Sequence, residues 1–123
     1  MTGVQTCALP ISTGPAIDHK PCNLISEIIA TFMLILAILC LGKMVDGLAP
    51  VVIGILIASI GMSFGATTGY ALNPARDFGP RLAYTILPIP NKGTANWQYA
   101  WVPFVGPLIG AGLAVVFFKL VAP

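Results

Sequence analysis

The most constraining feature of this sequence is a helix start placed within strongly apolar sequence. Residues 73–77 read Asn-Pro-Ala-Arg-Asp. Asn is a strong N-cap because its side chain can accept from the first free backbone N–H groups, and Pro at the first helical position leaves no N–H unsatisfied. The helix that begins at Pro74 is predicted to reach about residue 84, which is roughly 16 Å, or about half the hydrocarbon thickness of a bilayer.

Arg76 lies one turn inside this short helix. Because a charge is costly at membrane depth, we expect Arg76 to face a polar cavity rather than lipid. A helix that starts within a membrane is tolerated only where it is buried in protein or lines a water-filled path. The segment therefore predicts a pore or a substrate site.

The chain as a whole has the composition of a membrane protein. It is 57% hydrophobic and 8% charged, whereas soluble domains average roughly 25% charged. Apolar stretches at about residues 22–42, 48–65 and 98–120 are each about long enough to cross a bilayer. Together with the half-helix at about 74–84, they predict an all-α integral membrane protein. Aromatic residues are expected to form an interfacial belt at the start of the last span, namely Trp97, Tyr99 and Trp101.

The N-terminal residues are interpreted separately. Residues 1–11 back-translate into a string that resembles a common short-read sequencing adapter, and we expect them to be an artefact outside the fold. The alternative is a genuine, slightly apolar N-terminus, which lacks the basic region and apolar core of a signal peptide. On the artefact hypothesis the chain is a C-terminal fragment of a longer protein. Residues 12–21 are polar and turn-rich and are predicted to form an extramembrane loop.

The sequence from Gly69 to Arg81 closely resembles the second pore motif of the aquaporin superfamily. It reads Gly-Tyr-Ala-Leu-Asn-Pro-Ala-Arg-Asp-Phe-Gly-Pro-Arg, and an Asp after the Arg of the motif is the pattern of the glycerol-conducting branch, the glycerol uptake facilitators. The resemblance extends from about Ser26 to Lys119. In that family three spans and one half-helix form a unit, and an inverted copy completes the channel. The resemblance implies that this chain is the second inverted repeat, and that its partner is an N-terminal repeat missing here.

The resemblance implies a selectivity filter formed by Gly61, Tyr70 and Arg76. A guanidinium presents several donors in a fixed plane and can hold two hydroxyls of one polyol, while an aromatic wall suits the C–H side of the polyol. Water-selective relatives carry His at the position of Gly61, so Gly predicts room for a three-carbon polyol. The alternatives are an Arg76 paired with Asp77, a lipid-facing Tyr70, and a Gly61 that serves only close helix packing, as we expect of Gly54.

Hydrogen-bonding groups are expected to line the path beside this filter. Small solutes must exchange their hydration for hydrogen bonds to the wall of a narrow pore. The pore motif consists of Asn73, Pro74 and Ala75, and the Asn amide offers donors. The positive end of the half-helix disfavours cations. Residues 66–72 are predicted to be irregular, and acceptors are expected from the carbonyls of Gly69, Tyr70 and Ala71.

Three ionisable residues are expected to support the filter without touching solute. Glu27 is the ionisable group inside the first span, and the resemblance implies that it accepts hydrogen bonds from the backbone of the pore loop. A position at the membrane interface is the alternative for Glu27. Asp77 and Arg81 match the glycerol-conducting pattern. A carboxylate in the first turn stabilises a helix start by about 0.3–1 kcal/mol, so Asp77 is expected to organise the half-helix.

The sequence does not indicate an enzyme. His19 is the single histidine and has no partner at catalytic or ligand spacing. Cys22 and Cys40 would lie roughly 27 Å apart along one helix and so cannot bridge each other. We predict no catalytic residue, no metal site and no cofactor. The net charge of +2, without a basic cluster, argues against nucleic acid as a partner.

We therefore predict the C-terminal half of a passive channel for glycerol, and for water and other small neutral solutes. One alternative is a water-selective channel, against which Gly61 and Asp77 argue. Another is a non-conducting membrane module that acts only as an assembly partner. The resemblance implies a bacterial plasma membrane, a homotetramer at full length, and a cytoplasmic side that carries Lys43 and Lys119. The chain alone, with half a pore wall, is not expected to conduct as a monomer.

Overall fold

The computed structural model describes residues 13–45, 47–90 and 93–122, so the proposed adapter segment 1–11 lies outside the described residues. All regular structure in these ranges is helical. Three of its helices are long and apolar enough to cross a membrane, whereas the 13 residues of α3 reach only about 20 Å. This confirms the predicted fold class. The helices are α1 (Lys20–Leu41), α2 (Leu48–Thr68), α3 (Pro74–Ile86) and α4 (Trp101–Val121).

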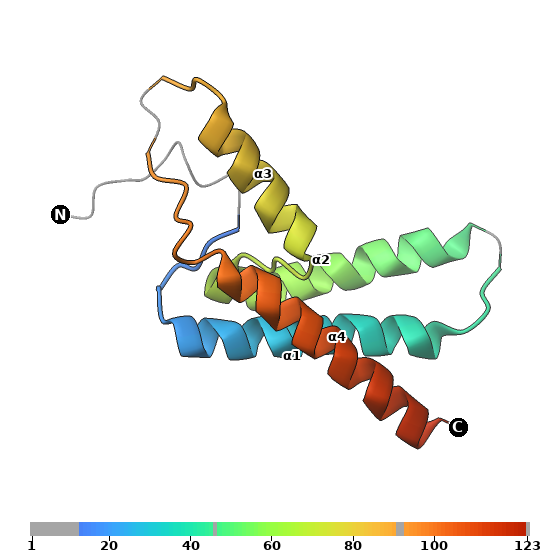
Figure 1. The fold of residues 1–123 in the computed structure, drawn as a ribbon. Coiled ribbons are helices and arrows are strands. Elements are labelled where there is room, and N and C mark those ends of the chain that lie inside the picture. The colour runs from blue at the N-terminus through green and yellow to red at the C-terminus, as the bar shows by residue number, and fades with distance from the viewer. Residues whose placement is uncertain (1–12, 46, 91–92, 123) are drawn as a thin grey trace.

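The three long helices are arranged around α1. Helices α1 and α2 form an antiparallel hairpin, and α4 crosses α1 obliquely along most of its length (Figure 1). The C-terminal ends of α1 and α4 lie at the same end of the molecule. After the C-terminal end of α2 the chain turns back along that helix, and α3 then starts above α2 and points away from the hairpin (Figure 1). The short helix therefore begins within the length of α2 rather than at its end.

Helix α4 packs on α1 through small residues spaced four apart. Gly106 and Gly110 are buried in this contact, and Ala114 continues the same face one turn later. A methyl group at Gly106 would lie 2.7 Å from Cβ of Glu27, and one at Gly110 would collide with the backbone of α1 at the Ile28 carbonyl. Helices associate closely in membranes where small residues let their backbones approach. This seam fixes α1, and with it Glu27, against α4.

The helix ends differ from the sequence-based boundaries by a few residues. Helix α1 starts at Lys20, with the ring of His19 accepting from the Cys22 N–H at 3.4 Å, so the preceding loop is shorter than residues 12–21. Helix α2 continues to Thr68, beyond the predicted end at 65, and Gly69 then closes it with φ +75° and a bond to the Gly65 carbonyl. Glycine takes this left-handed C-cap conformation without a Cβ penalty. The irregular segment is therefore residues 69–73 rather than 66–72.

Two expectations from the sequence are wrong. Tyr99 is fully buried and does not belong to an interfacial aromatic belt, whereas Trp97 and Trp101 are about two-fifths exposed. Burial raises the pKa of the Tyr99 phenol, and the nearby Glu27 carboxylate adds to the shift. Gly54 does not pack closely within this chain, because a methyl group there would meet no atom within 4 Å.

Candidate pore and selectivity filter

The segment between α2 and α3, residues 69–73, is an irregular pore loop with an unusual backbone. Tyr70 has φ +40° and Leu72 has φ +56°, although neither is glycine. Such left-handed conformations of ordinary residues cost about 1–3 kcal/mol each, and they persist only where the surroundings hold them. The loop therefore depends on contacts from elsewhere in the chain.

Glu27 supplies the contact that holds this loop. The side chain is fully buried on α1. Its two carboxylate oxygens accept the backbone N–H groups of Ala71 at 2.9 Å and Leu72 at 3.0 Å. Hydrogen bonds to a charged group contribute about 1.5–3 kcal/mol each, which is similar to the strain of the two left-handed residues. Glu27 thus makes the contact with the pore loop that the family resemblance implies.

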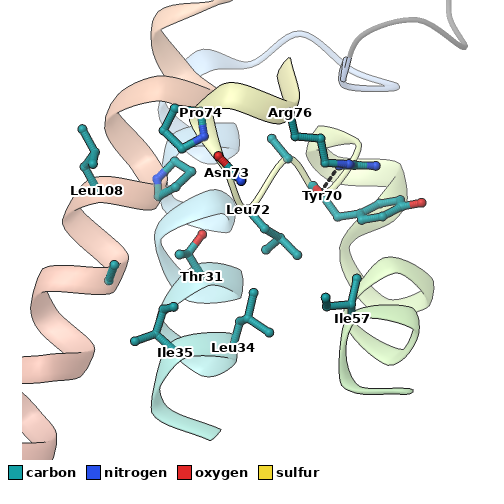
Figure 2. Close-up of a pocket in the computed structure, with 13 residues that line it drawn as sticks. Thr31, Leu34, Ile35, Ile57, Tyr70, Leu72, Asn73, Pro74, Arg76 and Leu108 are labelled. Carbon is teal, nitrogen blue, oxygen red and sulfur yellow. Dashed lines mark hydrogen bonds between the residues drawn. The ribbon is translucent and has the colours of Figure 1, made fainter. Parts of the chain in front are cut away.

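Asn73 starts α3 and faces the space between the helices. Its backbone is extended, and its Oδ1 accepts the N–H of Ala75 at 2.9 Å, with Pro74 as the first helical residue. Because the cap requires an acceptor, Oδ1 is engaged and the Nδ2 donors remain for solute. Figure 2 shows this amide between the two sides of the pocket. The N-terminal end of α3, with its positive dipole, points the same way.

Gly61, Tyr70 and Arg76 form one cluster beside the pore loop. The Arg76 guanidinium lies over the Tyr70 ring, with its carbon 4.4 Å from the ring centroid, which is a cation–π contact. A methyl group at Gly61 would lie 3.3 Å from two ring carbons of Tyr70. The ring therefore lies against the space that Gly61 leaves open.

The acceptor carbonyls predicted for the path are already engaged within the chain. Nη1 of Arg76 donates to the Gly69 carbonyl at 3.2 Å and to the Tyr70 carbonyl. The Ala71 carbonyl accepts the Asn73 N–H at 2.6 Å. Each carbonyl oxygen has a second lone pair and can still accept from a solute. The bonds also fix Arg76, leaving its Nε and Nη2 donors for other partners.

Tyr70, Asn73 and Arg76 border one pocket of about 430 Å³ that is mainly apolar, whereas Gly61 and Gly69 do not line it. Figure 2 shows apolar side chains of α1 and α2 below the pore loop, Leu108 of α4 to one side, and the polar groups of Asn73 and Arg76 at the level of the loop. An amphipathic solute would meet donors on one side of this path and hydrocarbon on the other. The lining residues are Thr31, Leu34, Ile35, Ile57, Tyr70, Ala71, Leu72, Asn73, Pro74, Arg76, Pro107, Leu108 and Ala111.

Asp77 and Arg81 lie beside the filter but do not line this pocket. Their side chains form a buried ion pair one turn apart on α3, with Nη2 2.7 Å from Oδ1. Arg76 donates instead to the pore loop. The geometry does not support the alternative in which Arg76 is a structural partner of Asp77.

Two contributors to the site were not identified from the sequence. Thr31 lies one turn after Glu27 and lines the pocket, and its Oγ1 is buried without a hydrogen-bond partner in the described part of the chain. Its α-helical spacing from Glu27 is the signal that would have placed it on the same face. Thr13 bonds to Asp77, 64 residues away, and no local pattern predicts such a contact.

The described residues contain no cluster of three or more side chains suited to bind a metal ion, and the two cysteines among them, Cys22 and Cys40, are free.

The sequence profile of the major intrinsic protein family matches residues 13–118. The chain belongs to this family. This confirms the family resemblance identified from the pore motif.

Individual relatives agree with this assignment. The glycerol uptake facilitator protein of Streptococcus pneumoniae serotype 4 is 59% identical over 111 residues, covering 89% of this chain and 47% of that protein. The glycerol uptake facilitator protein of Bacillus subtilis is 55% identical over 110 residues, covering 88% and 40%. The X-ray structure of the aquaglyceroporin from Plasmodium falciparum superposes with a TM-score of 0.79 at 32% identity, covering 90% of this chain and 49% of that chain. This chain thus spans less than half the length of each of these relatives.

Proposed function

We propose that this chain is the C-terminal half of a passive membrane channel that conducts glycerol, water and other small neutral solutes. The complete channel also requires an N-terminal repeat of the same protein, and it sits in the bacterial plasma membrane as a homotetramer. It is a conduit without catalytic residues, cofactor or metal. Relatives that are named as glycerol uptake facilitators support the solute class.

The observation that carries this proposal is the position of Arg76 between the pore loop and the Tyr70 ring. Nη1 is fixed by the Gly69 and Tyr70 carbonyls, so the remaining donors are presented in a constant plane. A polyol can use these donors and the Asn73 amide for its hydroxyls while its C–H groups face the ring and the apolar wall. Solute can enter when such binding replaces hydration, and it can leave because few groups hold it.

A water-selective channel is the rival within the same class. The absence of a side chain at Gly61 argues against it, because the Tyr70 ring lies beside Gly61 and against Arg76, so that a larger side chain at position 61 would push the ring into the path. A non-conducting membrane module is the rival from another class. It accounts for the apolar outer faces of the spans, but it gives no reason for a strained pore loop that aims polar groups into a pocket.

Solute flux in proteoliposomes separates these functions. Residues 13–122 are fused behind the part of the Bacillus subtilis facilitator that precedes its matching segment, and the purified fusion is reconstituted. Light scattering after mixing with glycerol or sucrose then gives the glycerol and water permeabilities. The 123-residue chain alone and the Bacillus subtilis half alone are the controls, and both are expected to match empty liposomes because each lacks half of the pore wall.

The proposal expects fast glycerol and water entry through the fusion. Water entry without glycerol entry would identify a water-selective channel. A folded fusion that moves neither solute would favour the non-conducting module, and glycerol entry through the chain alone would contradict the requirement for a second repeat.

A further inference from the structure

A buried arginine outside the pocket uses its complete hydrogen-bonding capacity. The side chain of Arg81 is about 1% exposed, and a guanidinium carries five N–H donors. Two of its bonds go to Asp77, from Nε to Oδ2 at 2.9 Å and from Nη2 to Oδ1 at 2.7 Å. The others go to backbone carbonyls, namely Thr13 at 3.1 Å, Asn96 at 2.8 Å, and Ala95.

Asp77 connects the same arginine to the segment that precedes α1. Its Oδ1 accepts the backbone N–H of Thr13 at 3.0 Å and the Thr13 hydroxyl at 2.6 Å. Both carboxylate oxygens are therefore bonded, and Thr13 is buried although it belongs to a loop. A buried ion pair is stable only when its remaining donors and acceptors are satisfied in this way.

This segment in turn covers the start of the pore loop. The Ala16 N–H donates to the Ala66 carbonyl at 3.0 Å, near the end of α2. A methyl group at Gly69 would lie 2.9 Å from the Gly14 nitrogen, so the two backbones are in direct contact. Gly69 also presents the carbonyl that accepts from Arg76. A continuous path of contacts thus runs from Arg81 through Asp77 and the segment 13–16 to the partner of Arg76.

We propose that Thr13, Asp77 and Arg81 form a positioning cluster that sets the selectivity of the channel. The cluster holds the segment 13–16 over Gly69, and this keeps the Gly69 and Tyr70 carbonyls directed at Arg76. When the cluster is weakened, Arg76 gains freedom and the filter admits larger polyols. The inference rests on the proposed channel function, and it assigns to Thr13 a role that depends on its hydroxyl.

The test compares substitutions that differ in one hydrogen bond, in the fusion described above. Thr13→Val removes the hydroxyl that donates to Asp77 but keeps the shape and the backbone N–H, whereas Thr13→Ser keeps the hydroxyl. Arg81→Lys retains the charge but loses the planar set of donors. Ser59→Ala is the control, because it removes one hydroxyl bond, to the Ile55 carbonyl at 2.9 Å, without touching Asp77 or Arg81.

The first readout is amide hydrogen exchange of peptides that contain Gly69 to Arg76, which does not require conduction. Thr13→Val is expected to speed this exchange by about tenfold, the factor that follows from the loss of one hydrogen bond to a charged group. Arg81→Lys should speed it at least as much, because three ammonium donors cannot replace the five bonds of Arg81. Thr13→Ser and Ser59→Ala are expected to stay near the parent rate. Equal exchange in Thr13→Val and Thr13→Ser would overturn the proposal.

The second readout is the permeability to a five-carbon polyol relative to glycerol, at equal amounts of folded channel. We expect this permeability ratio to be several-fold higher in Thr13→Val and Arg81→Lys, because Arg76 is then less constrained. The ratio should not change in the two control variants. An unchanged ratio with lower yield would show that the cluster serves folding alone and would overturn the proposal. A parent fusion that conducts no glycerol would refute the channel function, while the exchange readout would still decide whether the cluster positions the pore loop.

Discussion

Substitution at Gly110 is expected to weaken the contact between α1 and α4 much more than substitution at Gly112, only two residues away. A methyl group at Gly110 would collide with the Ile28 carbonyl and lie 3.1 Å from the Phe32 nitrogen, whereas one at Gly112 would meet no atom within 4 Å. Carbon contacts are comfortable at about 3.5–4.0 Å, so α4 must retreat by about 1 Å. The atoms in the way belong mainly to the backbone of α1, and no rotamer change can remove them.

The magnitude follows from this geometry. Overpacking typically costs about 1–3 kcal/mol, and a rigid backbone neighbour places Gly110→Ala near the upper end. Gly112→Ala creates no overlap, and the gain in helix propensity, up to about 1 kcal/mol, applies to both variants and cancels in the comparison. The two variants should therefore differ by about 3 kcal/mol in the free energy of unfolding. Titration of the chain from mild detergent into dodecyl sulfate, followed by helical circular dichroism, measures this difference. Variants that agree within about 0.5 kcal/mol would refute the close seam, since an error of that size is ordinary for such comparisons.

The remaining predictions concern the filter in the fusion with the Bacillus subtilis half. Gly61→His should lower the glycerol permeability at least about tenfold and leave the water permeability unchanged, because the new side chain drives the Tyr70 ring toward Arg76 and narrows the path. Equal loss of both permeabilities would argue against this filter. Arg76→Ala should let larger or charged solutes through, as measured by polyol and ion flux, and unchanged selectivity would remove Arg76 from the filter. Glu27→Gln should destabilise the pore loop by about 1.5–3 kcal/mol, because one backbone N–H loses its charged acceptor. Faster amide hydrogen exchange at residues 69–73 would measure this loss. Exchange as slow as in the parent would show that the carboxylate is dispensable.

Local chemistry made parts of this fold predictable. The Asn73 cap and Pro74 specify a helix start through groups that lie within three residues of each other, and the structure has α3 begin at Pro74. The three long spans follow from the number of consecutive apolar residues, which is independent of tertiary contacts. The seam of α4 was also predictable, because Gly106 and Gly110 have the small-residue spacing of close helix contacts.

The rest depended on contacts between distant residues. Glu27 meets the pore loop across 44 and 45 residues of sequence, and the family resemblance rather than any periodicity suggested that contact. Tyr70 and Leu72 are not glycines, so the sequence did not indicate their left-handed conformations. Arg81 meets Thr13 across 68 residues, and its role in joining three segments emerges only once the fold places them together. Residues held by such long-range bonds carry no local sequence signal.

The glycerol-to-water permeability ratio of the fusion tests the central claim most directly. It is measured in proteoliposomes at equal protein density, beside the intact Bacillus subtilis facilitator that shares the N-terminal half. If residues 13–122 provide half of a glycerol channel, the two proteins should give ratios within a few-fold of each other. A folded fusion that conducts water with no glycerol flux above that of empty liposomes would contradict the account.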